Sequence, residues 1–135
     1  LLGADVMPAA EIDKVENYDF VIFATSTWGM GDLQDDWFGA LEALAGKNLS
    51  GKKVALIGVG DQVSFGDTFV DGMGTIYEEI KDKGITLVGK TSVDGYDFSG
   101  SKAVVDGEFA GLVIDENNQS ELTEERIAAW VEKVR

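Results

Sequence analysis

Three short segments made almost entirely of apolar residues recur along this chain, and patterns of helical spacing separate them. The segments are residues 19–24, 53–58 and 85–89. A strand that is apolar on both faces is typical of a parallel sheet covered by helices on each side. Strands that alternate with helices favour the same architecture. The sequence therefore predicts one α/β domain over residues 1–135, with a doubly wound parallel sheet.

Apolar residues at intervals of three and four predict the helices. One helix carries Trp37 and ends near Gly46, a second covers residues 67–83, and a third covers residues 123–134 with Thr123 as its N-cap. Between the last two helices the chain is rich in glycine. There the Asp106-Gly107 pair predicts a tight hairpin, because both residues tolerate positive φ.

The absence of cysteine and histidine excludes several classes of function. The chain has no Cys and no His, so it cannot form a disulfide, a thiol nucleophile, an iron–sulfur cluster or a Ser-His-Asp triad. Zinc sites of the usual kind are excluded for the same reason. Redox chemistry, if the chain performs any, must come from an organic cofactor.

Two loops at predicted strand ends have the composition of a ligand site. In open parallel sheets, ligands bind beyond the carboxyl ends of the strands, so the loops after Ala24, Gly58 and Gly89 are the places to search. The first loop holds three hydroxyl residues, Trp28 and two glycines. The second holds a glycine, a carboxylate and Phe65. Two aromatic side chains on neighbouring loops could enclose one planar ring.

Three stretches of the chain resemble the flavodoxin family. Residues 25–37 (TSTWGMGDLQDDW) resemble its first flavin-binding loop, and residues 58–69 (GVGDQVSFGDTF) resemble its second. Residues 95–130 resemble the segment that distinguishes long-chain flavodoxins. The resemblance implies strand order 2-1-3-4-5 and a cytoplasmic, monomeric, low-potential electron carrier with one non-covalent FMN, which is not an enzyme.

The resemblance also implies roles for individual residues. Trp28 and Phe65 would flank the two faces of the flavin, although the family usually has tyrosine where Phe65 stands. The expected cofactor-binding residues are Thr25, Ser26, Thr27, Trp28, Gly29, Met30, Gly31, Val59, Gly60, Asp61 and Phe65. Among these, the hydroxyl residues would approach the ribityl–phosphate side, and the second loop would bind the pyrimidine edge. The Gly29 carbonyl would turn towards the flavin on reduction.

The charge of the chain predicts its partners. It has 25 acidic and 11 basic side chains and a net charge of −14, which disfavours nucleic acid and anionic membranes as ligands. No apolar segment is long enough to span a bilayer and no leader is visible. Acidic residues gather in and beside the two loops: Asp32, Asp35, Asp36, Asp61 and Asp67. We expect the partners to be basic-surfaced redox proteins such as a flavodoxin reductase.

The first residues depart from the family pattern. Residues 1–7 resemble the end of the family's first helix and its second strand, so strand 1 and the phosphate-binding loop are expected to be missing from this chain. That loop would hold the FMN phosphate at a helix N-terminus. No phosphate-binding residue is therefore assigned from the sequence.

Two other functions on the same architecture remain open from the sequence. An FMN-dependent reductase would need an open flavin face, which Trp28 and Phe65 would close. A receiver-type signalling domain would need an aspartate at the end of the central strand, where Thr25 stands. Residues 115–120 weakly resemble a calcium loop but lack its central glycine, so we expect a solvated turn and a helix cap there.

Overall fold

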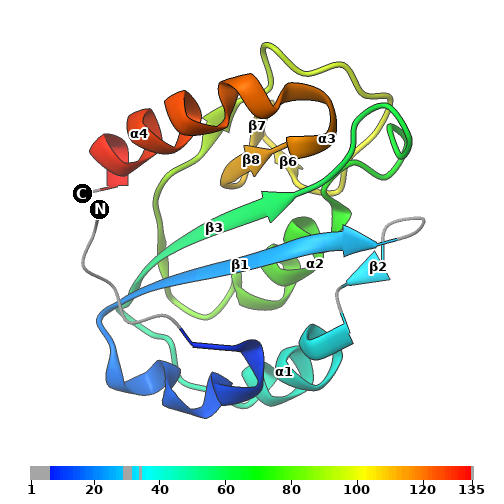
Figure 1. The fold of residues 1–135 in the computed structure, drawn as a ribbon. Coiled ribbons are helices and arrows are strands. Elements are labelled where there is room, and N and C mark those ends of the chain that lie inside the picture. The colour runs from blue at the N-terminus through cyan, green and yellow to red at the C-terminus, as the bar shows by residue number, and fades with distance from the viewer. Residues whose placement is uncertain (1–6, 29–31, 34, 135) are drawn as a thin grey trace.

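The computed structural model describes residues 7–28, 32–33 and 35–134, and for residues 10, 28, 32, 33, 35 and 36 it describes the backbone alone. Four segments form the central sheet: β1 (Phe20–Trp28), β3 (Lys53–Val59), β4 (Thr86–Leu87) and β8 (Leu112–Ile114). β3 pairs in parallel with each of the other three. This confirms the predicted parallel strands (Figure 1).

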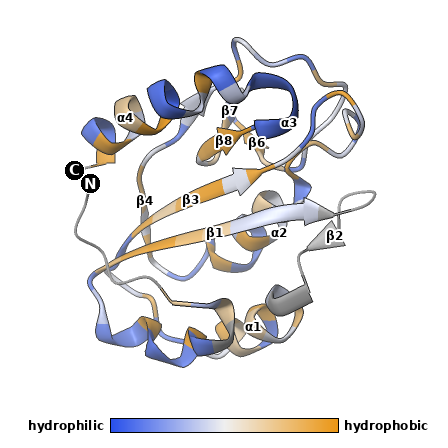
Figure 2. Cartoon of the chain, viewed as in Figure 1, coloured by the Kyte–Doolittle hydropathy of each residue, from blue (hydrophilic) through white to orange (hydrophobic). Residues whose placement is uncertain are grey.

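Helices cover both faces of this sheet. Val54 and Leu56 of β3 pack in one core with α1 (Asp35–Ala45) and α2 (Asp71–Ile80). Ala55 and its neighbours on β8 pack in a second core under α4 (Thr123–Val134). Figure 2 shows the hydrophobic colour along most of β1 and β3, and an alternation of hydrophilic and hydrophobic colours along α4. Among the described residues, no helix is long and apolar enough to cross a membrane.

The last parallel strand is divided into two pieces. β4 pairs with Lys53 and Val54 at the start of β3, and β8 pairs with residues 57–59 at its end. Between them the chain forms a lobe, residues 88–111, with a small antiparallel sheet of β5 (Thr91–Ser92), β6 (Val104–Val105) and β7 (Glu108–Phe109). The predicted hairpin at Asp106-Gly107 is confirmed, with φ of 53° and 83° at these residues.

This division corrects the predicted strand at residues 85–89. The strand ends at Leu87, and Gly89 has a φ of 81° where the chain passes beneath Trp130. The indole Nε1 of Trp130 donates to the Gly89 carbonyl over 2.9 Å, and a Cβ at position 89 would lie 2.6 Å from that nitrogen. The loop after Gly89 is therefore not at the carboxyl edge of the sheet. Ile114 ends the strand there instead.

One predicted helix start and one predicted helix cap are wrong, although the predicted bounds of the last helix, residues 123–134, are confirmed. Residues 67–70 are turns, and α2 begins at Asp71, because Val70 has a φ of 48° and the Phe69 amide donates to Gly100 outside the helix. Thr123 does not cap α4. Its hydroxyl is buried without a hydrogen-bond partner, and helical structure already begins in α3 (Glu116–Gln119) and η2 (Ser120–Leu122). Asp115 is the N-cap of that segment.

The remaining elements lie at the start of the described chain. η1 (Ala9–Asn17) packs against α1, and β2 (Asp32–Leu33) pairs antiparallel with the end of β1. The order β1-β3-β4 matches the last three positions of the predicted 2-1-3-4-5 order. The segment expected to be the second strand, residues 1–7, lies outside the described residues except for Met7.

Candidate functional site

Three strand ends meet at one edge of the sheet. Ser26 of β1 pairs with Val59 of β3, and Val59 also pairs with Ile114 of β8. The loops that follow these strands therefore begin side by side, as they do at the ligand-binding edge of open parallel sheets. The sequence predicted the loop after β3, but the loop expected after Ala24 starts too early, because β1 continues to Trp28. The third, which begins at Asp115, takes the place expected for the loop after Gly89.

The end of β1 is held by backbone and hydroxyl contacts. Thr25 is buried and its hydroxyl donates to the Ser26 carbonyl over 3.0 Å. The Thr27 hydroxyl accepts from the Gly72 amide over 2.9 Å, which ties β1 to the first turn of α2. Trp37 is buried, and its indole donates to the Ala24 carbonyl over 3.0 Å. The chain then doubles back, with Trp28 opposite Asp32.

In the second loop, Asp61 is the residue that shapes the backbone. Its carboxylate accepts from the amides of Val63 at 3.1 Å and Ser64 at 2.9 Å. It also accepts from the side-chain amides of Asn117 at 3.1 Å and Asn118 at 2.8 Å. The hydrogen bonds from the Ser64 amide and from Asn118 lower the pKa of Asp61 to about 2. The carboxylate therefore stays ionised and closes the turn.

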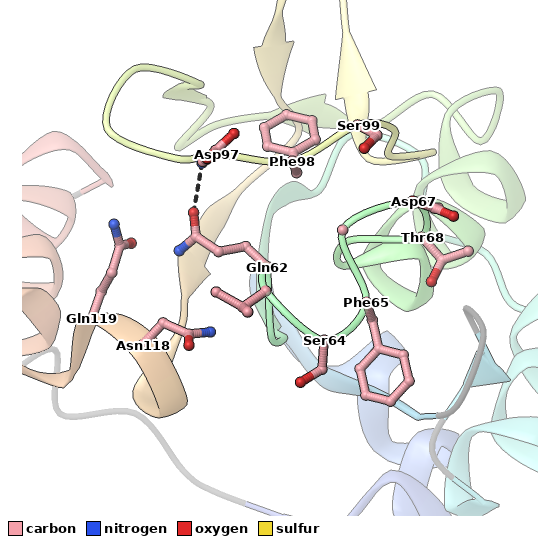
Figure 3. A pocket seen from close by; sticks show the side chains of 12 residues that line it. Gln62, Ser64, Phe65, Asp67, Thr68, Asp97, Phe98, Ser99, Asn118 and Gln119 are labelled. Atoms are coloured by element: carbon pink, nitrogen blue, oxygen red, sulfur yellow. Dashed lines mark hydrogen bonds between the residues drawn. The ribbon is translucent and has the colours of Figure 1, made fainter.

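The tip of this loop presents apolar side chains to solvent. Val63 is 75% exposed, and the Phe65 ring, which would be buried in an ordinary core, is 39% exposed. Figure 3 shows the Phe65 ring pointing away from Gln62 and Asp97. An exposed aromatic face on a loop closed by its own hydrogen bonds suits stacking against a flat ring.

The same loop, with Val63 and Phe65 included, lines a cavity that is open to solvent. Its volume is about 830 Å³, within the range of roughly 300 to 1,000 Å³ usual for ligand pockets (Figure 3). The lining comes from residues 62–68, 97–99, 118 and 119. Thr25, Ser26 and Thr27 do not line it, so this cavity is separate from the end of β1. The described residues contain no cluster of Asp and Glu that could hold a metal ion.

Comparison with known proteins identifies the family. The family model for flavodoxin matches residues 2–130. The flavodoxin of Nostoc sp. (strain PCC 7120) is 43% identical over 126 residues, which cover 93% of this chain and 74% of the Nostoc protein. The flavodoxin of Helicobacter pylori (strain 26695) is 46% identical over 135 residues, covering 98% of this chain and 81% of the relative. The chain belongs to the flavodoxin family.

A solved flavodoxin structure agrees with this membership. The structure of a Fusobacterium nucleatum flavodoxin bound to flavin mononucleotide superimposes with a TM-score of 0.87 at 35% identity. The match covers 90% of this chain and 73% of that one. The predicted flavodoxin-like α/β fold is thereby confirmed.

In the structure of this chain, the described residues of the predicted site lie together at the carboxyl edge of the sheet. Thr25, Ser26, Thr27, Val59, Gly60, Asp61 and Phe65 all lie at or just beyond the ends of β1 and β3. Gly29, Met30 and Gly31 lie outside the described residues, and for Trp28 only the backbone is described. The flavin contacts of all these residues stay predictions.

Sequence reasoning missed three residues of this flavodoxin site. Gln62 is buried, Asp115 is completely buried, and Asn118 lies between Asp61 and Asp115. The solvated turn and helix cap expected at residues 115–120 are confirmed for the exposed residues Glu116 to Asn118, but the capping residue Asp115 is itself buried. One signal was available: Asp115 directly follows the apolar run Leu112–Ile114, which is the position of a residue at a buried strand end.

Proposed function

We propose that this protein carries single electrons between redox enzymes at low potential through one non-covalently bound FMN. The flavodoxin family has this function, and the chain belongs to that family. FMN supplies the redox chemistry when it is bound, since the chain has no cysteine or histidine that could hold another redox centre. The observation that carries the proposal is the Phe65 ring, 39% exposed on a closed loop beside the end of β1.

The residues at this edge fit a flavin. We assign Phe65 to one face of the ring system and Trp28 to the other. The second loop, Val59 to Asp61, would border the pyrimidine edge through its backbone, because the Asp61 carboxylate is engaged inside the protein. Thr25 and Thr27 also use their hydroxyls within the protein. At the ribityl–phosphate side, these two residues would therefore contact FMN through their backbone and through van der Waals contacts.

The finer assignments rest on other features. The lobe at residues 88–111, which divides the last parallel strand, supports the long-chain type. The acidic loops support docking to basic redox proteins. The monomeric state and the cytoplasmic location stay predictions of the sequence.

Stacking on Phe65 is tested by substitution. Phe65→Ala should weaken FMN binding by about 1 to 3 kcal/mol, the range found when aromatic platforms under nucleic-acid bases are removed. The control is Phe38→Ala, because Phe38 is also an exposed phenylalanine, 58% exposed, but lies on α1 outside both loops. Fluorescence titration of the apoprotein with FMN measures both affinities.

Equal losses in the two variants would remove Phe65 from the site, and a parent protein without FMN affinity would overturn the proposed function. Turnover of NAD(P)H by the FMN-loaded protein alone would favour the FMN-dependent reductase instead.

A further inference from the structure

A hydrogen-bond network, buried at Gln62 and Asp115, adjoins the second loop. Asp115 is completely buried, and one oxygen of its carboxylate accepts from the Gln62 backbone amide at 3.0 Å and from the Gln62 side chain at 2.7 Å. The side-chain oxygen of Gln62 also has a partner, because it accepts from the Asp97 backbone amide at 2.6 Å. Gln62 therefore connects the loop to the strand end at β8 and to the lobe.

Asn118 connects this network to Asp61. Its side-chain amide donates to Asp61 at 2.8 Å and to both oxygens of Asp115, at 3.1 and 3.0 Å. Its backbone amide donates to Asp115 at 3.1 Å, which is the helix cap. Burial acts to raise the pKa of Asp115, but the hydrogen bonds from Asn118 and Gln62 outweigh it and the pKa is lowered. A charged group this deeply buried persists only when its partners satisfy it.

We infer that Asp115, Gln62 and Asn118 are positioning residues that fix the second loop, and with it Phe65, in the conformation that receives the flavin. The inference rests on the proposed function, and it assigns a role to residues outside the predicted flavin contacts. The geometry explains why the loop needs this support: Val63, Ser64 and Phe65 are exposed, so no core packing holds the tip. Its shape depends on Asp61 and on the residues behind it.

An exchange of donor and acceptor tests the network. Asp115→Asn keeps a good N-cap but turns an amide towards the Gln62 amides, and Gln62→Glu places a carboxylate against Asp115. The double variant restores a carboxylate–amide pair with the roles reversed, and the carboxylate introduced at position 62 can still accept from the Asp97 amide. The backbone amide of residue 62 still faces an amide, so the recovery should be partial.

FMN dissociation constants and dissociation rates are measured for the four proteins by titration and stopped-flow fluorescence. Each single variant should raise the dissociation constant about tenfold or more, since each leaves buried polar groups without partners. The double variant should recover more than half of that loss on a logarithmic scale. Gln119→Ala is the matched control. Gln119 lines the same cavity, but it bonds to Gly95 of the lobe at 2.8 Å and to Arg126, away from the second loop. Its effect should stay within about twofold.

Hydrogen exchange separates positioning from general stability. In the full-length apoprotein, the amides of residues 61–66 should exchange faster in both single variants and recover in the double variant, while the amides of β1 and β3 remain as protected as in the parent. Losses that simply add in the double variant, or faster exchange spread over the whole sheet, would overturn the inference. If the parent does not bind FMN, the proposed function fails, and the exchange measurement still decides whether the network holds the loop.

Discussion

The two edges of the sheet are stabilised by side chains of opposite charge. At the carboxyl edge, aspartates accept from backbone amides: Asp61 from Val63 and Ser64, and Asp115 from Gln62 and Asn118. At the amino edge, lysines donate to backbone carbonyls. Lys52 donates to Glu16 and Tyr18, Lys53 to Val134, and Lys83 to Ala45 and Lys47.

This difference follows from the direction of the backbone in an α/β fold. Helices leave amides without partners at their N-termini and carbonyls without partners at their C-termini. The helices that follow parallel strands begin at the carboxyl edge and end at the amino edge. Carboxylates are therefore favoured at one edge and ammonium groups at the other. The carboxylates that accept from backbone amides therefore lie at the same edge as the proposed flavin site, because both depend on the direction of the chain.

The largest expected effect is on the rate of association with a basic partner, when one negative charge is reversed at either edge. Asp67 precedes α2 and Asp82 follows it, so Asp67→Lys and Asp82→Lys make the same change of net charge at opposite edges. Asp67→Lys should slow association about tenfold at 0.1 M salt, since steering of this kind changes association rates by roughly 10- to 1,000-fold. Asp82→Lys should have a much smaller effect.

Stopped-flow electron transfer with a basic reductase at increasing ionic strength measures this difference. The two variants should converge near 1 M salt, where the Debye length falls to about 3 Å. Equal slowing by both variants would show that only net charge matters, and rates that do not change with ionic strength would show that charge does not steer association at all.

Removing a lysine from the amino edge should have a moderate effect on stability. Lys83 donates to the carbonyl of Ala45, the last residue of α1, at 2.8 Å and to that of Lys47, just beyond the helix, at 3.1 Å. Lys83→Met should therefore lower the free energy of unfolding by about 1 kcal/mol. Lys81→Met is the control, because Lys81 only pairs with Glu78 on the exposed surface of α2. Urea unfolding measures both. If Lys81→Met costs as much as Lys83→Met, the carbonyl contacts are not what stabilises this edge.

Some features of the fold and the site follow from local sequence patterns, and others depend on tertiary contacts. The parallel strands, the hairpin at Asp106-Gly107 and the positions of Asp61 and Phe65 follow from apolar runs and from glycine chemistry. The division of the last strand does not, because the departure of the chain at Gly89 depends on Trp130, which is 41 residues away in sequence.

The supporting network could not be predicted for the same reason. Gln62 and Asp115 are 53 residues apart and form a contact only when β8 pairs with β3. Local pattern places each of them on a loop, and only the tertiary pairing buries them. The start of α2 at Asp71 likewise depends on the lobe. The Phe69 amide donates to the Gly100 carbonyl there, so residues 67–70 do not form the helix that the sequence predicts.

The smallest expected effect concerns the acid stability of the carboxyl edge. The folded pKa of Asp61, about 2, lies below its ordinary value of 3.8. A lowered pKa means that the ionised carboxylate stabilises the fold above pH 3.8 and loses this contribution as the pH falls from there towards 2. Because Asp61 is partly exposed, solvent screening should keep the contribution below about 1 kcal/mol.

Asp61→Asn should therefore show a shallower loss of unfolding free energy between about pH 4.5 and 2.5 than the parent. Urea unfolding of the apoprotein across this range measures the slope, and Asp94→Asn, an exposed carboxylate outside the network, is the control that should follow the parent curve. An acid limb equally steep in the Asp61 variant would show that the amides of the loop do not depend on the charge of Asp61, and the asymmetry between the two edges would then rest on hydrogen-bond geometry alone.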